Sequence, residues 1–333
     1  MVLIGLGYAF LSGICNGLFT APMKLIPRWK WENIWLVFIV ISCLVLPFSL
    51  VSITVPDYPK LFSLAPPRAV LAALCFGFAW GFGAILFGRS VERLGVSVAN
   101  TLVIGISSAL GSLVPLALGG KLDFQLRQVI LFLGVTAFLV GVSTCGAASR
   151  RREALNTACP APHWTGYLFA CGAGIMSAVF NIGYCLALPI ASTGEQLGYS
   201  HFRSTNCIWM LMLGAGSIPN IVYCGILLFQ HRTAGLFFSQ RPSKAWMGSV
   251  LMGVLWGASI ILYGAASPLL GDIGPSIGWP LSLAVGLGTA NIVGLALGEW
   301  RNAAAASVRL MRTGIAILLV AIVLCALSAK VGL

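Results

Sequence analysis

The chain has 333 residues, of which 59% are hydrophobic and only 8% are charged, and its mean hydropathy is +0.96. A soluble globular protein carries about a quarter of charged residues, so this composition excludes an ordinary soluble fold with a separate catalytic or nucleic-acid-binding domain. The formal charge of +12 is therefore expected to orient the chain in a lipid bilayer rather than to bind nucleic acid.

Ten apolar stretches follow one another along the chain, each close to the length of about 20 residues that a membrane-spanning helix needs. Short polar connections separate them. The sequence therefore predicts an all-α membrane protein with ten transmembrane helices. The expected spans are 3–25, 34–55, 69–88, 95–118, 127–148, 164–188, 204–229, 245–266, 273–297 and 309–331.

Basic residues are distributed unevenly between the two sides that these spans define. Of the 20 lysines and arginines, 14 lie on the side of the connections that follow odd-numbered spans, and 6 lie on the opposite side. Because basic residues in short loops stay in the cytoplasm, we predict that both termini face away from it.

The chain also contains an internal repeat. A shift of 176 residues places residues 75–95 over 251–271 without a gap, and 8 of the 21 positions coincide, among them a shared Gly-x-x-Trp-Gly. Weaker matches, such as Gly13 with Gly174, flank this segment. Each unit would contain five spans, so the second copy enters the membrane from the opposite side, as in many transporters. We predict a first repeat at 1–150, a basic cytoplasmic linker at 151–163 and a second repeat at 164–333.

Neutral polar and aromatic side chains at mid-membrane depth are the candidate substrate-binding residues. Trp80 and Trp256 are equivalent in the repeat and lie near the centres of their spans, whereas tryptophan in membrane proteins prefers the interface. An indole can pack on the apolar face of a sugar ring, and helix packing is the alternative. Amides and hydroxyls at this depth either bond neighbouring helices or line a cavity. The candidates are Asn16, Trp80, Asn181, Trp256, Trp279, Ser282 and Asn291.

Residues typical of catalysis and metal binding are not grouped in the spans. All eight acidic residues lie at or near expected span ends or in connections, so no buried carboxylate is expected. His163 and His231 are expected in connections, and His201 at the start of the seventh span near Glu195. The ten cysteines form no C-x-x-C pair and are interpreted as small apolar residues. We therefore expect neither an enzyme nor a cofactor or metal site.

Three motifs point to a family. They are Ala-Pro-Met-Lys at 21–24 with Trp-Glu-Asn-Ile-Trp at 31–35, the stretch 76–95 with its Trp-Gly pair, and the stretch 279–303 ending in Glu-Trp-Arg-Asn-Ala. In these motifs the chain resembles the L-rhamnose/proton symporter family of the drug/metabolite transporter superfamily. The resemblance implies uptake of L-rhamnose or a related deoxyhexose, with protons, by alternating access across a bacterial inner membrane.

The chain departs from this family at Ser282, where the family carries a histidine in the ninth span. A hydroxyl does not titrate near neutral pH, so a related sugar or an uncoupled sugar facilitator is an open alternative. Two others are an exporter of small metabolites or drugs from the same superfamily, and a structural or sensory membrane protein, which would not need inverted halves.

Overall fold

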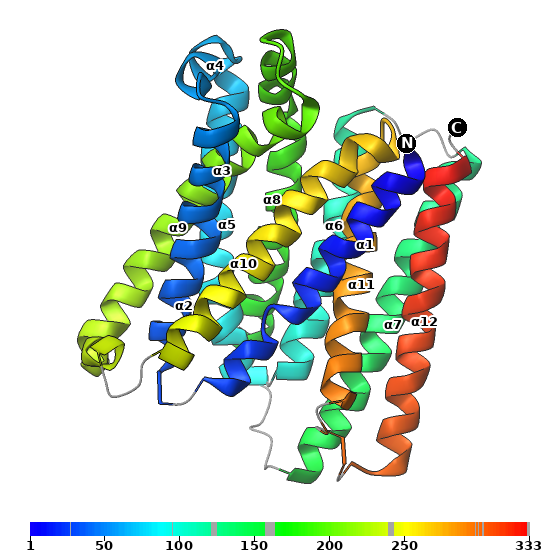
Figure 1. Ribbon diagram of the computed structural model, residues 1–333. Helices are drawn as coiled ribbons and strands as arrows, with labels where there is room; N and C mark the ends of the chain where they lie inside the picture. The colour runs from blue at the N-terminus through cyan, green and yellow to red at the C-terminus, as the bar shows by residue number, and fades with distance from the viewer. Residues whose placement is uncertain are drawn as a thin grey trace. The chain divides into compact units, whose positions relative to one another are not determined.

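The computed structural model describes residues 1–26, 28–94, 96–120, 125–156, 164–238, 243–296, 298, 300–301 and 303–331. Over these ranges the chain is helical and has no strand (Figure 1). Its elements are α1 (Val2–Leu18), η1 (Ala21–Leu25), α2 (Trp31–Ile39), η2 (Val40–Val45), α3 (Leu46–Thr54), α4 (Tyr58–Leu64), α5 (Pro67–Leu94), α6 (Val96–Leu118), α7 (Leu126–Asn156), α8 (Trp164–Gln196), α9 (His201–His231), η3 (Ala234–Phe238), α10 (Ser243–Ala266), η4 (Ser267–Leu270), α11 (Gly274–Ala296) and α12 (Ala305–Val331).

Ten helical segments are long and apolar enough to cross a membrane, which confirms the predicted number. Most of their ends agree with the prediction within a few residues, and the seventh covers His201–His231. The sixth extends furthest beyond its expected end, to Gln196. Helix α7 continues to Asn156, so the first part of the predicted linker is helical, while residues 157–163 lie outside the described part of the chain.

Contacts divide the chain into two compact units. Unit 1 consists of Met1–Gly17, Gly83–Ile182 and Ala266–Leu333, and unit 2 of Leu18–Phe82 and Gly183–Ala265. Each unit therefore takes helices from both halves of the sequence. The predicted repeat boundaries describe a duplication of the sequence, which these units do not test, and they stay a prediction.

In unit 1, α7 packs along α12 and α6 packs along α11 (Figure 1). Gly134 of α7 lies against Cys325 of α12, and Gly141 lies against Leu318. Because residue numbers rise along one helix and fall along the other, α7 and α12 are antiparallel. The glycines lack side chains, which allows the two helices to approach closely.

In unit 2, α2 and α3 pack against α9. Asn33, near the start of α2, donates from Nδ2 to the Thr233 carbonyl just beyond α9 at 3.0 Å. Phe48 of α3 lies against Gly214, much earlier on α9. The span formed by α2, η2 and α3 is therefore antiparallel to α9.

The π-helical turn η2 interrupts this span between α2 and α3. The Leu46 amide donates to the Ile41 carbonyl, five residues back. Pro47 follows directly and has no amide hydrogen with which to continue an α-helical pattern. The turn places Ser42 beside Gly257 of α10.

Glycines that the predicted duplication relates make matching contacts inside unit 1. Gly13 of α1 lies against Val285 of α11, and Gly174 of α8 lies against Ile106 of α6. In both cases the glycine also meets the carbonyl oxygen three residues earlier on the facing helix. The two contacts therefore have the same local geometry.

Unit 2 contains a second matching set. Gly81 of α5 lies against the Gly216 carbonyl of α9, and Gly257 of α10 lies against the backbone of Ser42. The glycine four residues earlier in each helix meets the carbonyl four residues earlier on the same partner. Both stripes of small residues thus contact a neighbouring backbone directly.

Candidate functional site

Unit 2 brings together the two tryptophans that the sequence identified. The rings of Trp80 on α5 and Trp256 on α10 are stacked, with centroids 5.3 Å apart and planes inclined by 12°. Both residues are half-buried. Phe38 of α2 meets Trp256 edge-on, with centroids 5.8 Å apart. Each indole covers one face of the other, so the two rings form one aromatic surface.

Gly81 and Gly257, which follow the two tryptophans, and Asn220 connect the helices that surround this stack. Gly81 and Gly257 allow α5 and α10 to touch the backbones of their neighbours. Asn220 of α9, which is buried, donates from Nδ2 to the Gly81 carbonyl at 2.9 Å. Its Oδ1 accepts from Trp35 Nε1 at 3.1 Å. These bonds link α2, α5 and α9, so the amide serves helix–helix bonding.

An aromatic row on α2 leads to the stack, and the sequence reasoning missed it. Trp31 stacks on Trp35 with centroids 5.1 Å apart, and Trp35 packs on Phe38 with centroids 4.7 Å apart. Spacings of four and three residues place three rings on one helix face. That periodicity is visible in the sequence and is sufficient to predict the row.

In unit 1, Asn181 replaces a hydrogen bond that Pro115 removes. Proline has no amide hydrogen, so the carbonyl four residues earlier, on Gly111, loses its helical partner. Nδ2 of Asn181, on α8, donates to this carbonyl at 2.8 Å, and the residue is 0% exposed. A longer donation, at 3.4 Å, reaches the Pro275 carbonyl. Asn181 therefore satisfies the backbone of α6 and α11.

Trp279 joins the same cluster. Its Nε1 donates to the Ser107 carbonyl of α6 at 3.1 Å, and Gly111 leaves space for the indole. The hydroxyl oxygens of Ser107 and Ser177 lie 2.8 Å apart. Neutral hydrogen bonds thus connect α6, α8 and α11 inside unit 1.

The other three predicted residues of unit 1 lie on α1 and α11. Ser282 donates from Oγ to the Ala9 carbonyl at 3.2 Å and is buried. Asn16 is half-buried, with its Nδ2 beside Gly286. Asn291 is half-buried, and its Nδ2 is shielded from solvent with no hydrogen-bond partner among the described residues. An unpaired buried donor costs free energy, so Asn291 is well suited to donate to a ligand.

Three of the seven predicted residues are therefore buried and bonded to backbone carbonyls, and four are half-buried. In unit 1, Asn181 of α8 and Trp279 of α11 both donate to carbonyls of α6, and in unit 2 Trp80 stacks on Trp256. Convergence of all seven residues on a single cavity stays a prediction.

A buried carboxylate paired with an imidazole at the end of α9 corrects the expectation that no carboxylate is buried. Glu32 is 4% exposed. Its Oε1 lies 3.0 Å from His231 Nδ1 and accepts from Thr233 Oγ1 at 2.8 Å. The expectation was wrong because α2 begins at Trp31, so Glu32 lies in its first turn and the end of α9 covers it. His231 is the last residue of α9 rather than a loop residue.

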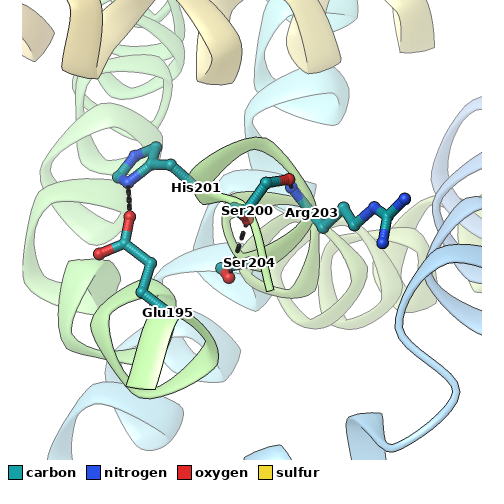
Figure 2. Close-up of polar contacts among 5 residues, drawn as sticks. All are labelled: Glu195, Ser200, His201, Arg203 and Ser204. Atoms are coloured by element: carbon teal, nitrogen blue, oxygen red, sulfur yellow. Dashed lines mark hydrogen bonds and ion pairs between the residues drawn. The ribbon is translucent and has the colours of Figure 1, made fainter. Parts of the chain in front are cut away.

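A second carboxylate–imidazole pair lies at the beginning of α9 (Figure 2). His201, the first residue of the helix, pairs with Glu195 in the last turn of α8; the sequence predicts that the two residues lie near each other, but not that they pair. The side chains are 37% and 43% exposed. Ser200 accepts from the Arg203 amide at 3.5 Å as the helix N-cap, and the Arg203 side chain points away from the pair (Figure 2).

Ten helices long and apolar enough to cross a membrane, with neutral polar side chains buried within each unit, define a multi-pass membrane protein. The family model described as L-rhamnose-proton symport protein (RhaT) matches residues 1–331, so the chain belongs to this family. It is a family of symporters rather than of enzymes, which confirms the resemblance and the non-enzymatic prediction. In the described part of the chain, no three His, Cys, Asp or Glu side chains are grouped to hold a metal ion.

Similar proteins cover nearly the whole chain. The L-rhamnose-proton symporter of Citrobacter koseri is 24% identical over 330 residues, which is 96% of each chain. That of Escherichia coli O1:K1 / APEC is 25% identical over 331 residues, again 96% of each chain. The L-rhamnose-proton symporter of Enterobacter sp. (strain 638) is 25% identical over 330 residues, with 96% of each chain covered.

Proposed function

We propose that this protein takes up L-rhamnose, or a closely related deoxyhexose, together with protons by alternating access across a bacterial inner membrane. The family match over residues 1–331 carries the proposal, because it covers all ten spans rather than one shared helix. The relatives with 24–25% identity are L-rhamnose-proton symporters by name. The sugar and the proton are the expected small partners, and no cofactor is required.

In this proposal, residues 1–150 and 164–333 form an inverted repeat. Inverted copies are related by an axis in the membrane plane, so equivalent spans run in opposite directions. The fifth and tenth spans, α7 and α12, are antiparallel in unit 1. The second and seventh spans are antiparallel in unit 2. The matching glycine contacts of Gly13 and Gly174 provide further support.

The proposed orientation places both termini in the periplasm. It is supported by the 14 basic residues on the side of the odd-numbered connections, against 6 on the other. In short loops such an excess marks the cytoplasmic side. An accessible cysteine at Asp57→Cys, in the second connection, is therefore expected to react with an impermeant maleimide added outside intact cells.

The seven predicted residues are the proposed sugar-contacting set, and the Trp80–Trp256 stack is the best supported part of it. It is half-buried, aromatic and built from equivalent positions of two spans. Aromatic surfaces of this kind suit the apolar face of a deoxyhexose. The buried donor of Asn291 suits a sugar hydroxyl.

The test is uptake of labelled L-rhamnose into proteoliposomes with and without an imposed pH gradient, acidic outside. We expect saturable uptake that exceeds equilibrium only with the gradient. Trp256→Ala is expected to lose most uptake while its elution volume in detergent stays that of the wild type. Absence of saturable uptake for L-rhamnose and for related deoxyhexoses would overturn the proposal.

A second candidate is an uncoupled facilitator of the same sugars. It is favoured by Ser282, whose hydroxyl cannot titrate near neutral pH and donates instead to the Ala9 carbonyl. A facilitator would equilibrate L-rhamnose at the same final level with or without the gradient.

A further inference from the structure

Among the carboxylates whose side chains the structure describes, Glu32 is the one that is buried. Its side chain is 5% exposed, whereas Asp57, Glu195 and Asp272 are exposed. Burying an ionised carboxylate is costly unless it is paired, and in transport proteins such a group inside the bundle often marks a proton pathway. Glu32 therefore needs a functional explanation that a surface carboxylate does not.

The partner of Glu32 is itself titratable. His231 Nδ1 lies 3.0 Å from Glu32 Oε1, and the imidazole side chain is 53% exposed. The permanent cations next to this pair in the sequence, Lys30 and Arg232, are exposed. An arginine or lysine would compensate the carboxylate at every physiological pH, but a histidine changes its charge near neutral pH. The partner of the buried carboxylate is thus a side chain that can both donate and accept a proton.

The elements packed against α2 include α9, η2, η3 and α10, and Lys244, the charged residue of α10, is exposed. Helix α9 contributes His231 and, two turns earlier, the buried thiol of Cys224. The sequences of η2 and η3 contain no acidic or basic residue. Thr233 donates its hydroxyl to Glu32, and its carbonyl accepts from Asn33. His231 is therefore the described basic group that faces the carboxylate.

We propose that Glu32 binds the proton that is coupled to sugar uptake, and that His231 carries this proton between Glu32 and water. In the resting pair, neutral His231 donates from Nδ1–H to the Glu32 carboxylate. A proton from water adds to Nε2 while the Nδ1 proton moves to Glu32 Oε1, which leaves a neutral carboxylic acid and a neutral imidazole. The net change is the gain of one proton, and the reverse transfer releases it. The inference rests on the proposed function.

Protonation of Glu32 has a direct path to the aromatic stack within unit 2. The resting carboxylate accepts a hydrogen bond from His231, whereas the neutral carboxylic acid donates one to it, so protonation alters the contact between the start of α2 and the end of α9. Trp31, the residue before Glu32, begins the aromatic row of α2: it stacks on Trp35, which packs on Phe38. Phe38 in turn meets Trp256. A shift of α2 would therefore reach the proposed sugar-contacting surface.

The test compares Glu32→Gln with Glu195→Gln, which alters the exposed pair at the opposite end of α9. Wild-type protein and both variants are reconstituted in proteoliposomes with L-rhamnose. Accumulation driven by a pH gradient and exchange of internal for external sugar at equal pH are measured separately. We expect Glu32→Gln to lose gradient-driven accumulation and L-rhamnose-dependent alkalinisation outside, with measurable exchange. Glu195→Gln should accumulate the sugar as the wild type does.

Gradient-driven accumulation by folded Glu32→Gln at the wild-type level would overturn the proton assignment and leave the proposed transport function intact. If Glu32→Gln does not fold, His231→Gln serves instead. It keeps the carboxylate but removes the relay, so the pH at half-maximal uptake should shift; an unchanged pH profile would overturn the assignment. Absence of L-rhamnose transport by the wild type would overturn the proposed function itself, and the proton assignment with it.

Discussion

The two ends of α9 carry the same pair of side chains in opposite electrostatic settings. At the end of the helix, His231 pairs with Glu32, which lies in the first turn of α2. At its beginning, His201 pairs with Glu195, which lies in the last turn of α8. Helix N-termini favour negative charge and C-termini favour positive charge. The carboxylate of the first pair is therefore at a favourable helix end, and the carboxylate of the second pair is at an unfavourable one.

Burial separates the pairs further. Glu32 is 5% exposed in its side chain and also accepts from Thr233, whereas Glu195 is 43% exposed and meets water. Solvent screens an exposed pair, while a buried carboxylate depends on its partners. The same two residue types therefore form a buried, hydrogen-bonded contact between α2 and α9 at one end of α9. At the other end they form a weak, solvent-exposed contact.

Replacing each histidine in turn should give the largest difference in the free energy of unfolding between the two pairs. His231→Ala leaves a buried carboxylate without one of its hydrogen-bond partners, which is expected to cost on the order of 2–3 kcal/mol. His201→Ala removes an exposed pair and should cost less than about 1 kcal/mol. The measurement is reversible unfolding in detergent, followed by near-UV circular dichroism. Equal losses in the two variants would contradict the difference drawn between the two ends.

Removing the hydroxyl of Thr233 should have a smaller effect on the free energy of unfolding, because it removes a single hydrogen bond to Glu32. Thr233→Val keeps the side-chain volume but removes the donor to Glu32, which is expected to cost about 1–2 kcal/mol. The matched variant is Ser200→Ala, which removes the N-cap at the exposed end. That cap bond is long, at 3.5 Å, so its loss should fall near the lower limit of about 0.5 kcal/mol. A larger loss of unfolding free energy in Ser200→Ala than in Thr233→Val would contradict the expectation that the buried pair contributes more to stability.

The effect of salt on the coupling free energy should also distinguish the two pairs, with a smaller difference than the substitutions above. Exposed charges are screened when the ionic strength rises, and buried pairs are screened much less. Double-mutant cycles for Glu195 with His201 and for Glu32 with His231 are measured at low and high sodium chloride. The coupling free energy of the first pair should fall toward zero, while that of the second pair should persist. A fall of the same size in both cycles would show that water reaches Glu32.

The spans were predictable because hydropathy is a property of consecutive residues. Trp80 and Trp256 could be identified as equivalent residues because the repeat aligns them. Their stacking could not be predicted in this way because it results from tertiary packing. The loss of a hydrogen bond at Gly111 could be read from Pro115 four residues later. The donor that replaces it, Asn181, comes from another helix, and no local pattern identifies it.

The burial of Glu32 was not predictable for the same reason. Its environment consists of residues about 200 positions away, on the end of α9 and just beyond it. In the sequence, Glu32 follows a charged and aromatic segment and has the appearance of an interfacial residue. Span position alone therefore underestimates how deeply a carboxylate at a helix end is covered by a neighbouring helix.

Tyr199 supplies the weakest test, at the exposed end of α9. Its hydroxyl donates to Asp57 Oδ2 at 2.9 Å, and this hydrogen bond, with burial and the carboxylate charge, raises the pKa of Tyr199. A raised pKa favours the neutral phenol in the folded state. Its stabilising contribution is therefore complete below the unfolded tyrosine pKa of about 10 and is lost as the pH rises through the folded value. The melting temperatures of wild type and Tyr199→Phe should differ by a small constant amount up to this pH and converge above it. A difference that instead changes between about pH 5 and 8 would implicate the neighbouring His201–Glu195 pair and raise its importance relative to the buried one.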